Sequence, residues 1–173
     1  MHLRDATSAD LDAVESIYQH YVETSTCTMQ TAPGTKEQRL AWFAQHGPRH
    51  PVLVLEEFGE VLAWGSLTRY HAREGYAPTV EDSIYVRHDQ RGRGCGQTLL
   101  AELTARAERA GHRSIIAMIA ADQPASLRLH ERHGFTRVAL LREVGFKMGR
   151  WIDVAFFQRM LASPRDLPGQ ETG

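Results

Sequence analysis

The first fifty residues place apolar side chains with the period of an α-helix. Between residues 8 and 24 these side chains recur three and four positions apart, which predicts one helix with a single apolar face. The positions are Leu11, Val14, Tyr18, Tyr21 and Val22. A shorter helix is expected from about residue 35 to residue 47, because Thr35 is followed three positions later by an amide side chain, a spacing typical of helix starts. A short strand at residues 3–6 and a polar loop over residues 25–34 complete this part.

From residue 51 onward the pattern changes to the β-branched and apolar runs of strands. Two such runs on either side of Phe58-Gly59 predict a hairpin, and residues 79–86 predict a third strand after an irregular stretch at residues 70–78. Helical and strand patterns then follow one another to the end of the chain. We expect a helix from about Gln97 to Gly111, a strand at 114–119, a helix at 124–133, and strands at 136–141 and 152–160.

These elements predict one α/β (α+β) domain over residues 1–162, with helices on both faces of a mixed sheet. The chain of 173 residues is long enough for one compact core, and residues 163–173 are expected to form a disordered C-terminal tail. Against 20 basic residues stand 21 acidic ones, which gives no overall field for nucleic acid or an anionic membrane. Two cysteines, no signal-like N-terminus and no apolar run of bilayer length favour a cytoplasmic protein.

The strongest local signal is the glycine-rich segment Arg91–Gly96, which stands between a predicted strand and a predicted helix. Glycines let the backbone approach a phosphate closely, and the amides at a helix start carry partial positive charge. The spacing fits neither the P-loop nor the dinucleotide fingerprint, since the lysine of the first and the last glycine of the second are absent. The segment is therefore either a phosphate-binding loop of another type or a plain glycine-rich turn.

This segment resembles the pyrophosphate loop of the Gcn5-related N-acetyltransferase (GNAT) superfamily. The strand at residues 79–86 and the segments 126–135 and 141–154 are similar to its phosphinothricin N-acetyltransferase branch, and the likeness runs from about Leu3 to Leu161. It implies a mixed, mostly antiparallel sheet flanked by helices, and an enzyme that transfers acetyl from acetyl-CoA to the α-amino group of phosphinothricin, methionine sulfone, methionine sulfoximine or a related analogue. A protein or peptide N-acetyltransferase of the same fold and a non-catalytic acyl-CoA-binding sensor remain alternatives.

The resemblance also implies which residues bind acetyl-CoA. The backbone at Ile84, Tyr85 and Val86 would align the pantetheine arm. The segment from residue 91 to residue 97 would hold the pyrophosphate, through Arg91, Gly92, Arg93, Gly94, Cys95, Gly96 and Gln97. Ser126 and Gln123 complete the cofactor set, with Gln123 standing where the family usually has asparagine. We interpret the thiol of Cys95 as incidental to the chemistry.

Glu81 is an acidic residue within an apolar strand, where burial would raise its pKa toward neutrality. A general base of this kind suits N-acetylation, because a primary amine must lose a proton before it attacks a thioester. Strand alternation puts Glu81 and Asp82 on opposite faces, so Glu81 could instead face solvent while Asp82 faces the cleft. The resemblance implies that Glu81 is the base, acting directly or through water.

His130 and His133 are three positions apart with a glutamate between them, whereas the zinc-protease helix has its histidines four apart. No metal site is therefore expected. The resemblance implies that His130 returns a proton to the CoA thiolate, a role for which an imidazole is suited by its near-neutral pKa. The alternative is a histidine that only packs or caps near the helix end, which is our interpretation of His133.

For the acceptor, the resemblance implies contacts from Arg73 and Tyr76 in the irregular stretch and from Met29, which replaces the usual phenylalanine. Arginine forks and tyrosine hydroxyls suit a substrate with an α-carboxylate. Arg73 and Tyr76 could also belong to an exposed loop. Members of the family are commonly homodimers, and Phe146, Trp151 and Phe156 fit either a subunit interface or the core.

Overall fold

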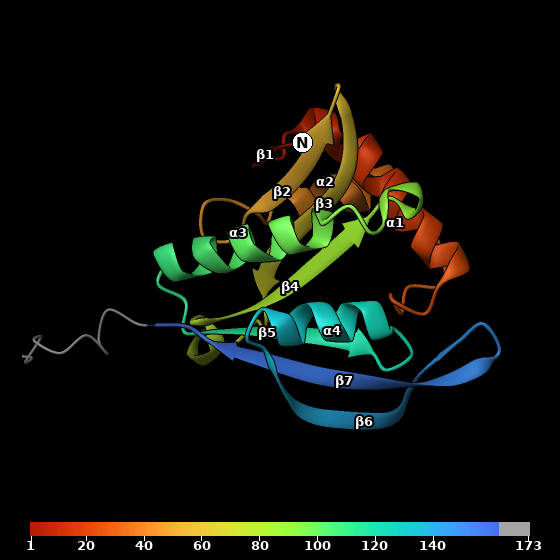
Figure 1. Ribbon diagram of the computed structural model, residues 1–173, viewed down its shortest axis with the longest axis vertical. Coiled ribbons are helices and arrows are strands. Elements are labelled where there is room, and N and C mark those ends of the chain that lie inside the picture. The colour runs from red at the N-terminus through yellow and green to blue at the C-terminus, as the bar shows by residue number, and fades with distance from the viewer. Residues whose placement is uncertain (163–173) are drawn as a thin grey trace, which may run out of the picture.

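The computed structural model describes residues 1–162, and the predicted tail at residues 163–173 lies outside them. One sheet runs through the described part of the chain in the order β1-β2-β3-β4-β5-β7-β6 (Figure 1). Its strands are β1 (His2–Asp5), β2 (Val52–Glu57), β3 (Glu60–Arg69), β4 (Thr79–Val86), β5 (Ser114–Ala120), β6 (Thr136–Lys147) and β7 (Arg150–Met160). Neighbouring strands are antiparallel except β4 and β5, so the predicted mixed, mostly antiparallel sheet is confirmed.

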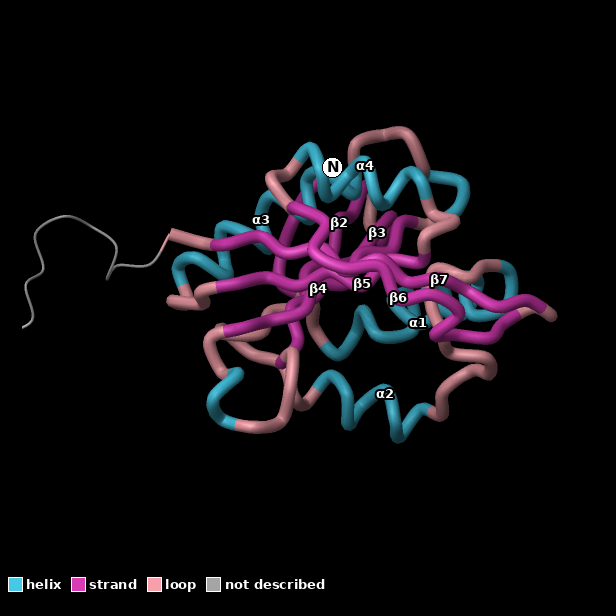
Figure 2. The backbone as a smooth tube through the Cα atoms, turned by 90° about the horizontal axis from the view of Figure 1, so that it is seen from below, coloured by secondary structure: helices cyan, strands magenta, loops and turns pink. Residues whose placement is uncertain are grey.

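Four α-helices flank this sheet in the described residues. They are α1 (Leu11–Thr24), α2 (Lys36–Phe43), α3 (Cys95–Arg109) and α4 (Pro124–Arg132). Figure 2 shows α1 and α2 on one side of the sheet and α3 and α4 on the other. None of the described helices is long and apolar enough to cross a membrane.

The elements follow the sequence pattern closely, with two informative differences. The capping box at Thr35 starts α2 as predicted, through a bond from the backbone N–H of Gln38 to the Thr35 hydroxyl. The helix α3 begins at Cys95, two residues before the expected position, directly after the left-handed Gly94. The strands β6 and β7 form a longer hairpin than expected, because β6 continues past an irregularity between Leu141 and Gly145.

The core has two parts, one on each face of the sheet. Buried leucines of α3 pack against the inward side chains of β2, β3 and β5, with Leu99, Leu100 and Leu103 fully buried. On the opposite face, Val14 and Ile17 of α1 pack against Val54 and Trp64. Covering both faces with apolar side chains fixes the centre of the sheet between the helix layers.

The strands β4 and β5 separate in the middle of the sheet. They are paired only from Thr79 to Glu81, opposite Ser114 to Ile116, whereas β4 stays paired with β3 as far as Val86 and β5 with β7 as far as Ala120. Their divergence is visible in Figure 1. Beyond Glu81 the facing backbone edges therefore have no strand partner, and polar backbone groups of this kind need one from elsewhere.

Candidate active site

A cavity of about 910 Å³ lies where β4 and β5 diverge, between the start of α3, the helix α4 and the loop after α1. Most residues proposed from the sequence line it together. These are Met29, Glu81, Ile84, Tyr85, Val86, Arg91, Gly92, Gly94, Cys95, Gly96, Gln97, Gln123, Ser126 and His130. Its volume and its mixture of apolar walls with a few polar groups are typical of small-molecule sites.

The glycine segment leads into the N-terminus of α3, and the backbone there requires glycine at several positions. Gly92 and Gly94 have φ of +78° and +83°, which other residues rarely adopt. A Cβ on Gly96 would lie 3.2 Å from a Leu129 methyl group, so α3 and α4 approach closely here. The first amides of α3 have no partner within the helix, and their partial positive charge favours an anion at this end of the cavity.

Arg91 and Arg93 have different positions. Arg91 lines the cavity, and its Nε donates a hydrogen bond of 3.2 Å to the hydroxyl of Tyr21. Arg93 lies outside the cavity lining and forms an ion pair of 2.8 Å with Glu57. Of these two predicted phosphate contacts, Arg91 is thus the one at the cavity.

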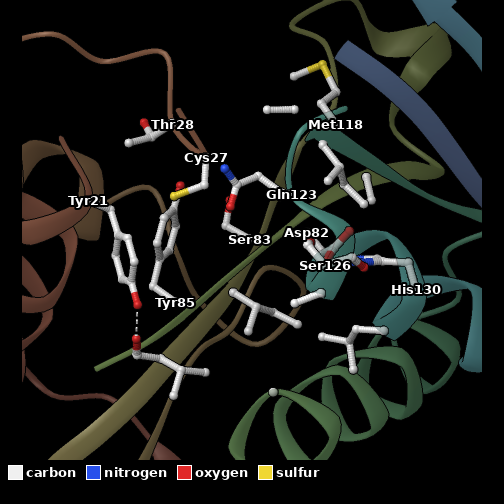
Figure 3. Close-up of a pocket in the computed structure, with 18 of the residues that line it drawn as sticks. Tyr21, Cys27, Thr28, Asp82, Ser83, Tyr85, Met118, Gln123, Ser126 and His130 are labelled. Carbon is white, nitrogen blue, oxygen red and sulfur yellow. Dashed lines mark hydrogen bonds and ion pairs between the residues drawn. The ribbon is translucent and has the colours of Figure 1, made fainter. Parts of the chain in front are cut away.

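Tyr21 is a site residue that sequence reasoning treated only as part of an apolar helix face. Its hydroxyl donates to the carbonyl oxygen of Val86 and accepts from Arg91, and Figure 3 shows it directed toward that strand. The cavity is also lined by Arg128 and Arg132, four residues apart on α4. A one-turn spacing of two arginines on an amphipathic helix was the available signal for them.

Cys95 contributes backbone to the cavity, but its side chain is part of the main core and is 1% exposed. Burial raises the pKa of this thiol, which keeps it in the unreactive protonated form. The interpretation of Cys95 as chemically incidental agrees with this environment.

Glu81 lies at the last paired position of β4, where the gap toward β5 opens. Burial raises the pKa of Glu81 to about 7, and the neighbouring charge of Asp82 adds to this effect. Glu81 lines the cavity and is thus not a solvated outward-facing carboxylate, and Asp82 lines the cavity as well. At neutral pH this carboxyl is present in both protonation states, as a base that exchanges protons needs to be.

His130 is buried at the opposite side of β4 and has both ring nitrogens engaged. Its Nδ1 lies 2.8 Å from the carbonyl oxygen of Ser126, and its Nε2 lies 3.0 Å from Oδ2 of Asp82. Figure 3 shows Asp82 and His130 pointing toward each other beside Ser126. Burial opposes charge on the ring, but the hydrogen bonds and the charge of Asp82 outweigh burial, so the pKa of His130 is raised.

The loop after α1 is fastened to the site from two sides. On one side, Gln123 donates to the Thr26 hydroxyl at 3.0 Å, and Thr26 bonds to the carboxylate of Asp122. On the other, the buried Nζ of Lys147 lies 2.6 Å from the Ser25 carbonyl oxygen. The longer amide of Gln123 therefore works as a link to this loop, which carries Met29.

Arg73 and Tyr76 lie outside the lining of this cavity. Both belong to the exposed segment between β3 and β4, where the Tyr76 ring packs 5.0 Å from His71 and 5.9 Å from Tyr70. The structure therefore does not bring them together with Glu81.

A second cavity of about 410 Å³ adjoins the first on the α1 and α2 side of the sheet. Both cavities share Tyr18, Ser83 and Tyr85 as lining residues. Ser83 and Tyr85 lie on the same face of β4 as Glu81, since strand residues two apart point the same way. Among the described residues, no group of three or more histidine, cysteine, aspartate or glutamate side chains could hold a metal ion.

The chain matches known proteins over most of its length. The model of the acetyltransferase (GNAT) family matches residues 14–135. A phosphinothricin N-acetyltransferase of Streptomyces viridochromogenes is 38% identical over 95% of this chain and 90% of its own length. An L-methionine sulfoximine/L-methionine sulfone acetyltransferase of Pseudomonas paraeruginosa is 39% identical over 96% of this chain and 98% of its own.

A solved structure agrees with the fold. A phosphinothricin acetyltransferase of Sinorhizobium meliloti in complex with acetyl-CoA superposes with a TM-score of 0.90, at 37% identity over 98% of this chain and 93% of that one. This chain thus shares the overall fold of that acetyltransferase. The chain belongs to the acetyltransferase (GNAT) family.

Proposed function

We propose that this protein transfers the acetyl group of acetyl-CoA to the α-amino group of a small amino-acid-like acceptor, such as phosphinothricin, methionine sulfone or methionine sulfoximine. The observation that carries the proposal is the position of Glu81, a carboxyl with a pKa near 7, at the point where β4 and β5 separate. The names of the relatives support the same class of acceptor.

Two features of the described residues fit acetyl-CoA. The unpaired edge of β4 at Ile84 to Val86 offers backbone hydrogen bonds to a pantetheine amide. The segment from Arg91 to Gln97 offers amides and one guanidinium to a pyrophosphate. When bound there, acetyl-CoA would supply the activated acetyl thioester.

The protein's own groups would then move two protons. Glu81 takes a proton from the acceptor ammonium, directly or through water, so that the amine can attack. His130 gives a proton toward the departing sulfur. Holding the amine next to the thioester can itself lower the activation barrier, by about 7 kcal/mol or more when the two groups are ideally aligned. No covalent bond to the protein is needed.

The acceptor side chain is proposed to extend from Glu81 toward the second cavity. Ser83 is two residues from Glu81 on the same face of β4 and lines that cavity. Met29 lies in the loop over this side and touches the position of Gly145, where a Cβ would come 2.5 Å from its Sδ. Arg73 and Tyr76 stay candidates for the acceptor carboxylate, which would need the segment 70–78 to approach the cavity.

The test measures free-thiol release from acetyl-CoA with a panel of amino acids, led by phosphinothricin and methionine sulfoximine. We expect saturable release with at least one of them, and a loss of about 10²-fold or more in Glu81→Gln, since general-base catalysis contributes roughly this much. Glu131→Gln, an exposed neighbour of His130 outside the cavity lining, is the matched control and should leave the rate unchanged.

Other outcomes separate the alternatives. Transfer to peptide N-termini but to no free amino acid would show that the acceptor is a peptide and not a small amino-acid-like molecule. Binding of acetyl-CoA with no transfer to any amine would favour a non-catalytic sensor over an enzyme.

A further inference from the structure

Asp82 connects the two groups proposed to move protons. It follows Glu81 directly on β4, so their side chains leave opposite faces of the strand. Its side chain is 1% exposed, with Oδ2 at 3.0 Å from Nε2 of His130. Its other oxygen, Oδ1, is buried without a hydrogen-bond partner in the described residues. A buried carboxylate costs free energy unless it is paired, so His130 is the partner that keeps it in place.

The hydrogen bonds fix the number of protons on this pair. A backbone carbonyl only accepts, so the 2.8 Å bond to Ser126 requires a proton on Nδ1 of His130. The 3.0 Å bond to Asp82 requires a second proton between Nε2 and Oδ2. With that proton on the ring, the pair is an imidazolium and a carboxylate.

The surroundings leave Asp82 as the main charge acting on both neighbours. Opposite it, β3 places Leu67 beside Asp82 and Thr68 beside Glu81, and β5 places Ile116 beside Glu81. The ring of Phe135 packs edge-on against the imidazole at 5.0 Å. The other titratable or charged side chains that line the same cavity are Tyr18, Tyr21, Cys27, Tyr85, Arg91, Arg128 and Arg132.

We propose that Asp82 is a positioning residue for acetyl transfer: it holds His130 in the charged, oriented form that can give a proton, and its charge acts on Glu81 from the next position of β4. The inference rests on the proposed function for the roles of Glu81 and His130. The Asp82 carboxylate thereby acts on both Glu81, the proposed base, and His130, the proposed acid, which lie on opposite faces of β4.

The directions of the pKa shifts agree with this arrangement. Burial alone would lower the pKa of His130, and the hydrogen bond and charge of Asp82 reverse that direction. For Glu81, burial and then the charge of Asp82 both raise the pKa. Neutralising Asp82 should therefore lower the pKa of His130 and the pKa of Glu81.

The first test is an NMR titration of the His130 ring in the isolated protein, with Asp82→Asn compared with wild type. The His130 signal is assigned by its absence from His130→Gln. Asparagine keeps the shape and removes the charge, and we expect the pKa of His130 to fall by about one unit or more. An unchanged pKa would overturn the proposal, and this readout needs no catalytic activity.

The second test is the pH profile of kcat/KM. With Glu81 as base and His130 as acid, the profile is bell-shaped, and Asp82→Asn should move both limbs to lower pH. A purely structural role predicts a lower curve with both limbs in place, and that result would overturn the proposal. Asp82→Glu keeps the charge and should return the limbs toward their wild-type positions, even if the rate stays low.

Asp10→Asn is the matched control. Asp10 is also buried and pairs with Arg4 at 2.8 Å, but it lies outside the cavity lining. We expect it to cost stability and to leave the pH profile unmoved. If no acceptor is acetylated at all, the proposed function fails while the NMR titration still decides the inference about the pair. If transfer occurs and Asp82→Asn shifts neither limb, only the inference fails.

Discussion

At the scale of single residues, Glu81 is where the needs of the fold and of the chemistry oppose each other. A carboxyl that sits partly buried at the end of a strand pairing is easily kept neutral and costly to ionise. Its folded-state pKa of about 7 stands above the ordinary value of 4.5, so the folded protein binds this proton more tightly than the unfolded chain does. The group that makes a base available near neutral pH therefore weakens the fold as it ionises.

This gives a stability prediction whose sign follows from linkage. The contribution of Glu81 is fully present below pH 4.5 and is lost as the pH rises through 7, because the unfolded chain releases the proton first. Glu81→Gln resembles the protonated form at every pH. We expect it to be more stable than wild type at pH 8.5, by about 1–2 kcal/mol after allowance for the partly exposed position, and to gain little at pH 5.

Urea unfolding of both proteins at the two pH values measures the difference. An equal gain at pH 5 and pH 8.5 would contradict the link to ionisation. Glu131→Gln controls for the loss of a surface carboxylate.

At the scale of elements, the sequence predicts the helices and strands but does not indicate where the pairing of β4 with β5 ends. The strand β4, the glycine segment and α3 follow from period, β-branched content and glycine positions, all of which are local. The gap after Glu81 is not local, because Glu81 and Asp82 belong to one uninterrupted strand pattern and only the approach of β5 decides where pairing ends. The roles of Tyr21 and Asp82 depend in the same way on partners that lie 48 to 70 residues away in the chain.

The hairpin of β6 and β7 provides an anchor that the sequence did not indicate. Lys147, at the end of β6, reaches the C-terminal end of α1, where carbonyl groups lack helical partners. Its Nζ lies 3.3, 2.6 and 2.9 Å from the carbonyl oxygens of Tyr21, Ser25 and Thr28. One ammonium thus fastens the loop that carries Met29 to a distant hairpin.

We predict that Lys147→Met destabilises the protein by about 2–3 kcal/mol, since bonds to a charged donor are lost and buried carbonyls stay unpaired. The loop from residue 25 to residue 35 should exchange its amide hydrogens faster, and KM for the acceptor should rise more than KM for acetyl-CoA. Urea unfolding, hydrogen exchange and steady-state kinetics measure the three effects. Lys36→Met, on the exposed first turn of α2, is the control. Unchanged exchange of the loop in Lys147→Met would contradict the anchoring role.

At the scale of the whole molecule, exposed apolar side chains gather on β6 and β7. They are Val138, Leu141, Val144, Phe146, Trp151 and Met160, with Met148 in the turn between the strands. Phe146 and Trp151 pack together at 5.1 Å and are still 55% and 61% exposed, so packing in the core does not account for them. Phe156, the third residue considered for an interface, lines the cavity, as do Leu141 and Val144 of this set. A gathering of large apolar side chains on one hairpin is typical of an interface.

We therefore predict a homodimer that buries this hairpin. Light scattering should give a mass of twice the 19.5 kDa of one chain, and the double variant Phe146→Ser, Trp151→Lys should give a single chain. Phe58→Ser is the matched control, because Phe58 is fully exposed at the turn between β2 and β3, away from this hairpin. A wild-type protein that stays monomeric at micromolar concentration would refute the interface. Since the same hairpin carries Lys147 and Gly145, which contacts Met29, loss of the dimer should also raise KM for the acceptor while leaving acetyl-CoA binding at the far end of the cavity unchanged.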